Sequence, residues 1–189
     1  MKTSSKEPLL EPLLRSLRLR RVINYIPSKC KLLDIGCGSK ASFLKAISPK
    51  INEGYGVDFK VHSQKRGNIQ TQQIRLDEDL PFEDEFFDCI TMLAVLEHIE
   101  KEQEILKEIH RVLKPNGNLI ITVPSVWAKP VLEFLSFKLG IVSKAEILDH
   151  KRYYNAEILH NVIIESAGFT KIYHKYFQLW MNNFCVATK

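Results

Sequence analysis

A strand that breaks into a glycine-rich turn is the feature that most restricts how this chain can fold. Residues 31–39 read KLLDIGCGS, an apolar run that acquires an acid at Asp34 and then ends at Gly36 and Gly38. Glycines let the backbone of such a turn come close to a ligand, and a helix that follows would add partial positive charge at its N-terminus. The pattern predicts a ligand crevice at the carboxyl end of a strand in an open α/β sheet.

Segments typical of strands and helices alternate along the chain. The predicted strands cover 31–36, 54–58, 69–76, 86–93 and 119–123, and the predicted helices cover 9–26, 40–47, 99–113 and 155–167. Two final strand-like runs, 169–177 and 179–187, have too few residues between them for a crossover and should pair antiparallel. We therefore expect an α/β fold with a doubly wound, mainly parallel seven-stranded sheet, an antiparallel C-terminal edge strand and helices on both faces.

The length favours a single domain over 1–189. A chain of 189 residues can bury a sizeable core but leaves no room for a second substrate domain. Within it, 1–26 should supply an N-terminal amphipathic helix, and 126–150 form an apolar insertion after the fifth strand. The four cysteines show no CxxC pairing and no histidines at metal-ligand spacing, so we expect reduced thiols and no metal site.

Charge and hydropathy set further expectations about partners and location. The net charge of +5 arises from 27 basic and 22 acidic residues, a mixed surface with no strong nucleic-acid signal. The first residues lack the apolar core of a signal peptide, and the apolar stretch 131–142 is interrupted by Glu133 and Lys138, so we expect a cytoplasmic location. The leucine- and arginine-rich helix 9–26 could meet an anionic membrane, although covering the sheet is a simpler use.

Three motifs resemble the class I S-adenosylmethionine-dependent methyltransferases, in particular the methyltransferase type 11 group. They are LDIGCGS at 33–39, LAVLEHI at 93–99 and RVLKPNG at 111–117. The resemblance covers residues 31–170 and implies a Rossmann-like fold, S-adenosylmethionine as the cofactor and methyl transfer as the reaction. That cofactor carries an ammonium group, for which the carboxylate of Asp34 would be favourable.

The resemblance also implies which residues hold the cofactor. Asp58 ends a predicted strand, where a carboxylate can accept both ribose hydroxyls, and Phe59 beside it would pack on the adenine. In the type 11 group an acid one residue before a leucine pairs with the adenine; this chain has Arg75 there, and Asp77 is the substitute. The expected cofactor-binding residues are Asp34, Gly36, Cys37, Gly38, Asp58, Phe59, Leu76, Asp77 and Leu93.

Glu97, His98 and His150 are the predicted catalytic residues. A base is needed only where the acceptor must lose a proton, and a histidine can equally be a structural residue. His150 and Tyr153 precede the last helix, where family members carry acceptor-side residues, although an ordinary loop explains them as well. The insertion 126–150 would roof the acceptor site or form a packed helix, and its apolar character indicates a small or lipid-linked acceptor.

Two alternatives of other kinds stay open. The run GCGSKA at 36–41, with Asp58 further on, also fits the dinucleotide-binding fingerprint of an NAD-dependent oxidoreductase. Asp34 argues against it, because the strand of that fingerprint stays apolar up to its first glycine and a carboxylate would repel a pyrophosphate. The second alternative is a protein that binds S-adenosylmethionine without catalysing a reaction.

Overall fold

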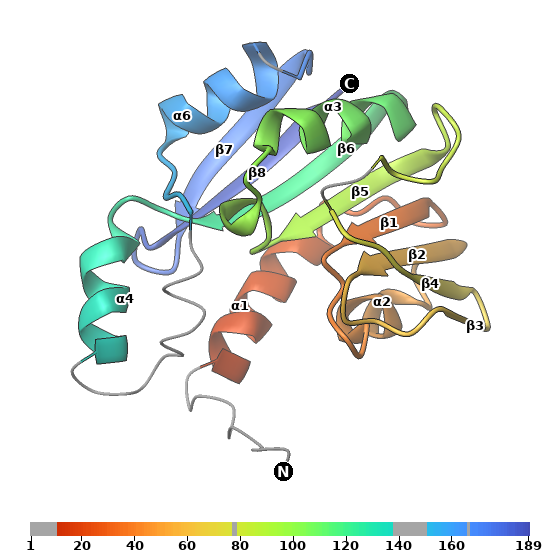
Figure 1. Cartoon of the computed structure of the whole chain (residues 1–189), viewed down its shortest axis with the longest axis horizontal. Helices are drawn as coiled ribbons and strands as arrows, with labels where there is room; N and C mark the ends of the chain where they lie inside the picture. Colours follow the sequence, from red (N-terminus) through yellow and green to blue (C-terminus); the bar gives the residue numbers. More distant parts are fainter. Residues whose placement is uncertain (1–10, 77–78, 138–150, 166) are drawn as a thin grey trace.

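A computed structural model describes residues 11–76, 79–137, 151–165 and 167–189. In this part of the chain, eight strands form one sheet in the order β3-β4-β2-β1-β5-β6-β8-β7 (Figure 1). The strands are β1 (Lys31–Ile35), β2 (Glu53–Asp58), β3 (Gln64–Arg66), β4 (Ile69–Gln73), β5 (Phe87–Leu93), β6 (Leu113–Pro124), β7 (Lys171–Phe177) and β8 (Asn182–Thr188). The helices are α1 (Glu11–Ile23), α2 (Ser42–Ile47), η1 (Leu96–His98), α3 (Glu102–Val112), α4 (Ala128–Phe137), α6 (Ala156–His160) and the π-helical η2 (Asn161–Glu165).

The sheet confirms the predicted doubly wound, mainly parallel α/β fold. Strands β4, β2, β1, β5 and β6 run parallel, and β8 pairs antiparallel with both β6 and β7. The two C-terminal strands thus form the predicted antiparallel edge, in which β7 is outermost and the reversed strand β8 lies between β6 and β7. The reason is composition: β8 contributes the buried Phe184, Cys185 and Ala187, whereas alternate residues of β7 are exposed, so the more apolar strand takes the covered position.

The predicted strand count of seven was one too low. The additional strand, β3, lies in the polar segment 60–67, where a crossover helix would have stood, and pairs antiparallel with β4. Gly67 has a φ of 58°, which lets the chain reverse immediately before β4. A strand of three exposed residues has no apolar pattern for the sequence to reveal.

Helices cover both faces of the sheet, as predicted. One cluster of buried apolar side chains lies between the sheet and α3, α6 and η2, and a second lies between the sheet and α1 and α2. Figure 1 shows α3 and α6 on one side of the strands and α1 and α2 on the other. The predicted helix 99–113 corresponds to α3, which the short η1 precedes, and the predicted helix 155–167 is divided into α6 and η2. No helix in the described ranges has both the length and the apolar character needed to cross a membrane.

The N-terminal helix α1 packs on the sheet next to β7 and β8. Its Val22 is fully buried, and the ring of Tyr25 lies 4.8 Å from that of Phe184. The guanidinium of Arg21 lies over the same phenylalanine ring at 5.4 Å, a cation–π geometry. Of the segment 1–26, Glu11–Ile23 form this helix, and residues 1–10 lie outside the described part.

Asn183 fastens the segment that follows the insertion to the end of β6. Its side-chain amide donates to the carbonyl oxygens of Tyr154 at 3.0 Å and Val123 at 3.4 Å. The side-chain oxygen of Asn183 lies 2.8 Å from a ring nitrogen of His174. The residue is completely buried, so these hydrogen bonds satisfy polar groups that water cannot reach.

We expect Asn183→Ala to lower the free energy of unfolding by about 2 kcal/mol or more, because it removes hydrogen bonds to two buried carbonyl oxygens. The side chain of the neighbouring Asn182 is half-buried and donates to the Gln178 side chain within the β7–β8 turn, so Asn182→Ala should cost less than about 1 kcal/mol. Urea unfolding of the two variants checks the difference, and equal losses would show that Asn183 does not hold the segment.

Candidate active site

The glycine turn after β1 is held against the end of β2. The backbone N–H groups of Gly36 and Cys37 both donate to the carbonyl oxygen of Val57, at 2.8 and 3.2 Å. Gly36 has a φ of 75°, and a Cβ there would stand 2.2 Å from a methyl carbon of Val95, so only glycine fits. Gly38 also has a positive φ, 69°, but nothing lies within 4 Å of its would-be Cβ. The backbone at Gly38 is therefore open to a ligand.

The carboxylate of Asp58 joins the two loops that form this side of the site. One oxygen accepts the Gly38 N–H at 2.9 Å, and the other accepts the Lys60 N–H at 2.7 Å. Asp58 stands at the carboxyl end of β2 and is only 8% exposed. Each carboxylate oxygen can accept a second hydrogen bond, so Asp58 keeps capacity for ligand hydroxyls.

Asp34 is a buried acid in the middle of the sheet, on β1, the strand next to the one that carries Asp58. It accepts a hydrogen bond of 2.7 Å from the Thr91 hydroxyl, its partner on β5. Burial raises the pKa of Asp34 from 3.8 to about 7, the charge of Asp58 adds to the rise, and the Thr91 hydrogen bond opposes it. A cation held nearby would favour the ionised carboxylate.

The β2 end also buries the Cys37 side chain, which α2 helps to cover. A Cβ at Gly56 would lie 2.9 Å from the Cys37 sulfur, so the thiol occupies the space that this glycine leaves. Burial raises the Cys37 pKa to about 12. The Cys37 thiol donates to the Gly38 carbonyl oxygen at 3.7 Å, so it packs within the turn. Helix α2 has six residues, and its N-cap, Ala41, makes no side-chain hydrogen bond, so the helix dipole is small.

Glu97 is a second buried acid, located in η1 after β5. It is 1% exposed, and one of its carboxylate oxygens, Oε2, has no hydrogen-bond partner. Burial raises its pKa to about 7, while nearby positive charge on His98 and Arg18 of α1 opposes the rise. The backbone carbonyl of Glu97 accepts the Lys151 N–H at 2.7 Å, which joins η1 to the segment after the insertion.

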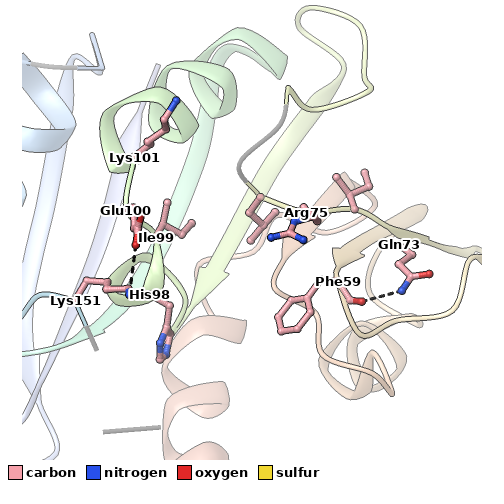
Figure 2. A pocket seen from close by; sticks show the side chains of 10 residues that line it. Phe59, Gln73, Arg75, His98, Ile99, Glu100, Lys101 and Lys151 are labelled. Atoms are coloured by element: carbon pink, nitrogen blue, oxygen red, sulfur yellow. Dashed lines mark hydrogen bonds and ion pairs between the residues drawn. The ribbon is translucent and has the colours of Figure 1, made fainter. Parts of the chain in front are cut away.

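A cleft of about 970 Å³ opens at the carboxyl ends of the strands, between two walls (Figure 2). Phe59 and residues 73–76, which follow β2 and β4, form one wall. Residues 98–101 and Lys151 form the other. Phe59 is 56% exposed and its ring borders the cleft, while its carbonyl is held by the Gln73 side chain at 2.9 Å. The volume is in the range of small-molecule sites, roughly 300–1,000 Å³.

The structure brings most of the predicted site residues to one edge of the sheet. Phe59, Leu76 and His98 line the cleft itself. The others lie in or beside the glycine turn, at the strand ends or in η1: Asp34, Gly36, Cys37, Gly38, Asp58, Leu93 and Glu97. Asp77 and His150 lie outside the described residues, so their roles stay predictions.

Sequence reasoning missed part of the cleft wall. Arg75, Lys101 and Lys151 line it, and Lys151 forms an ion pair of 3.4 Å with Glu100. Charged loop residues carry no periodic signal, and in the sequence only Arg75 stands out, as a departure from the family pattern. Thr91 could have been found, because it is a polar residue in an apolar strand and lies directly beside Asp34.

The arrangement suits a nucleoside that carries a positive charge. It offers a carboxylate at a strand end for ribose hydroxyls, an exposed aromatic ring for a base, an open glycine backbone and a buried acid near the turn. In the described ranges, no group of His, Cys, Asp or Glu side chains could hold a metal ion. The geometry therefore fits an organic cofactor bound by hydrogen bonds and stacking.

Solved structures share this fold. An S-adenosylmethionine-dependent methyltransferase from Archaeoglobus fulgidus superposes with a TM-score of 0.70 at 20% identity, covering 94% of each chain. One from Mesorhizobium loti gives a TM-score of 0.66 at 16% identity, covering 95% of this chain and 97% of the other. At these identities the likeness shows the fold alone, the Rossmann-like fold that S-adenosylmethionine-dependent methyltransferases have.

Sequence comparison gives the family. A family model described as a methyltransferase domain matches residues 10–174, so the chain belongs to that family, whose cofactor is S-adenosylmethionine. The ubiquinone/menaquinone biosynthesis C-methyltransferase UbiE of Vibrio cholerae is 34% identical over 119 residues, which are 56% of this chain and 44% of that protein. The demethylmenaquinone methyltransferase of Bacillus mycoides is 32% identical over 112 residues, or 53% and 46%. The matched region thus spans less than half the length of these relatives.

We expect the stability of the unliganded protein to fall as the pH rises from about 4 to about 7. Unfolded Asp34 ionises near its ordinary pKa of 3.8, whereas the folded residue holds its proton up to about 7. In this window the folded state binds more protons than the unfolded chain, so rising pH favours unfolding. Glu97 acts in the same direction.

Asp34→Asn should weaken this decline in stability with pH, since an amide cannot ionise. Thr91→Val should move the decline to higher pH, because the hydrogen bond that favours the ionised Asp34 is lost. Urea unfolding at a series of pH values measures both. A decline that is identical in wild type and Asp34→Asn would show that Asp34 is not the titrating group.

Proposed function

We propose that this chain transfers a methyl group from S-adenosylmethionine to a small or lipid-linked acceptor with an apolar ring, such as a quinone precursor. The observation that carries the proposal is the Asp58 carboxylate, which lies at the end of β2, accepts the Gly38 N–H and stands beside the exposed ring of Phe59. This arrangement suits the ribose and the adenine of the cofactor. The names of the UbiE and demethylmenaquinone relatives support a quinone-like acceptor.

The chain's contribution to the reaction is mainly positional. When bound, S-adenosylmethionine supplies a methyl carbon on a positively charged sulfur, which is already a good leaving group. The acceptor atom forms the new bond to that carbon in line with the breaking carbon–sulfur bond, and S-adenosylhomocysteine is the second product. The residues at the cleft must therefore hold the acceptor in line and exclude water.

A proton must leave the acceptor when a carbon or hydroxyl oxygen is methylated. His98 lines the cleft and is the nearest candidate to receive it. Glu97, directly before it, is buried with a carboxylate oxygen free of hydrogen bonds, so it can stabilise a positive charge on His98. His150 is a further candidate from the acceptor-side loop.

The acceptor would enter beside the insertion 126–150. This segment follows β6, whose carboxyl end lies at the same edge of the sheet as the glycine turn. Trp127 and Val131 are 62% and 40% exposed, so apolar side chains are exposed directly before α4 and in its first turn. An apolar or lipid-linked acceptor would be compatible with such a roof.

Asp58→Ala should weaken the binding of S-adenosylmethionine by about tenfold or more, because hydrogen bonds to the ribose are lost. Isothermal titration calorimetry measures the change, with Asp58→Asn as a second variant that keeps one oxygen acceptor. Glu83→Ala is the control, since Glu83 is an exposed acid before the amino end of β5. Unchanged affinity in a folded Asp58→Ala protein would remove Asp58 from the site.

His98→Gln should lower kcat by about a hundredfold while changing the affinity for S-adenosylmethionine little, if His98 accepts the acceptor's proton. Transfer of labelled methyl groups to a demethylated quinol, in long-tailed and short-tailed forms, provides the assay. His62→Gln on an exposed loop is the matched control. Tight cofactor binding with no transfer to any acceptor would favour the non-catalytic alternative.

A further inference from the structure

The turn between β7 and β8 has a backbone conformation that its sequence does not favour. Gln178, Leu179 and Trp180 have φ values of 52°, 55° and 68°. Three consecutive residues other than glycine thus lie in the left-handed region, where a Cβ approaches the backbone too closely. Strain of this kind persists only where the surrounding structure holds it, and it is common in segments with a function.

Contacts with the end of β6 hold this turn in place. The hydroxyl of Ser125 donates to the carbonyl oxygen of Trp180 at 2.6 Å. The backbone N–H of Ser125 donates to the carbonyl oxygen of Met181 at 2.9 Å. The Trp180 ring stacks on Tyr176, with centroids 5.3 Å apart and an interplanar angle of 10°. The turn is therefore a fixed structure joined to the segment that leads into α4.

This fixed turn and the start of α4 present apolar side chains to solvent. Leu179 is 92% exposed, Trp180 64%, Trp127 62% and Val131 40%. We name these four residues the tryptophan edge. The chain contains two tryptophans, and both lie here. Large apolar side chains gathered on a surface mark an interaction site more often than chance exposure does.

The tryptophan edge lies on the same side of the sheet as the cleft. Strands β6 and β7 both pair antiparallel with β8, so they run in the same direction as β1, β2 and β5. Their carboxyl ends, which lead into α4 and the β7–β8 turn, therefore share the edge that carries the glycine turn. Figure 1 shows α4 and this turn near one another beyond the ends of β6 and β7.

A basic residue accompanies the tryptophan edge. Lys129 lies between Trp127 and Val131 in the sequence and is exposed. The chain as a whole carries a net charge of +5. Cationic side chains next to exposed tryptophans complement a bilayer that contains anionic lipids, since tryptophan prefers the headgroup level and lysine is attracted to the negative surface.

We infer that the tryptophan edge docks this chain on an anionic lipid bilayer, with Leu179, Trp127 and Trp180 immersed at the headgroup level. Docking in this orientation turns the carboxyl edge of the sheet toward the membrane. The inference rests on the proposed function in one respect, that a lipid-linked acceptor would then reach the cleft without leaving the bilayer. Membrane binding itself requires neither cofactor nor acceptor.

Tryptophan fluorescence tests the inference directly. The full chain is mixed with vesicles of phosphatidylcholine alone or of phosphatidylcholine and phosphatidylglycerol, without cofactor. Trp127→Phe and Trp180→Phe leave one reporter each. We expect a blue shift with the anionic vesicles, and quenching by acyl-brominated lipids, in both variants. Unshifted emission from both reporters would overturn the proposal, even if the protein sedimented with the vesicles through charge alone.

Leu179→Asn separates docking from stability. Asparagine tolerates the left-handed region better than leucine, so the thermal midpoint should stay the same or rise. Vesicle affinity should fall about tenfold or more, because the most exposed apolar side chain is removed. Ile158→Asn is the matched control, since Ile158 is 39% exposed on α6.

Equal affinities of wild type and Leu179→Asn would contradict the inference, as would an equal loss in the Ile158→Asn control. A dimer that Leu179→Asn dissociates, together with absent vesicle binding, would assign the tryptophan edge to a second copy of the chain. S-adenosylmethionine binding measured on the same samples keeps this result separate from the proposed methyl transfer.

Discussion

The hydrogen bond from the Gly38 N–H to the Asp58 carboxylate is the contact on which the rest of the site depends. It fastens the turn after β1 to the end of β2, and the second Asp58 oxygen fastens the following loop through Lys60. Both loops are then rigid before any ligand arrives, so binding does not need to order them. The glycine at position 38 makes this possible, because its positive φ aims the N–H at the carboxylate and its missing Cβ leaves the ligand side open.

Charge is separated across the carboxyl edge of the sheet. Two acids, Asp34 and Glu97, are buried near the strand ends, and burial raises the pKa of each to about 7. Three basic residues, Arg75, Lys101 and Lys151, and one acid, Glu100, lie on the cleft wall. Buried acids lower the stability of the unliganded protein at neutral pH and favour a cationic ligand. The excess of positive charge on the wall and Lys129 beside the tryptophan edge favour an anionic surface outside. The same edge can thus hold a sulfonium nucleoside inside and face anionic lipid outside.

The sequence predicted the central strands well and the margins less well. The strands β1 and β5 were evident because buried parallel strands read as largely apolar runs, and β2 was evident because it ends in an acid at the right distance after the glycine turn. Strand β3 was missed because three exposed polar residues have no pattern. The inner position of the reversed strand depends on which of two neighbouring strands is buried more deeply. Within the site, Asp58 could be found by its place at a strand end. The hydrogen bond between Asp34 and Thr91 could not be predicted without knowing the register of β1 against β5. The left-handed turn at 178–180 could not be predicted because it contains no glycine, the residue that usually marks such a turn.

A crystal structure of the chain with S-adenosylhomocysteine tests the central claim most directly. The account predicts that the ribose hydroxyls lie within hydrogen-bonding distance of Asp58, that the adenine lies against Phe59, and that the amino acid part lies along the backbone at Gly38. A ligand bound elsewhere, or a ribose turned away from Asp58 in an otherwise unchanged site, would contradict it.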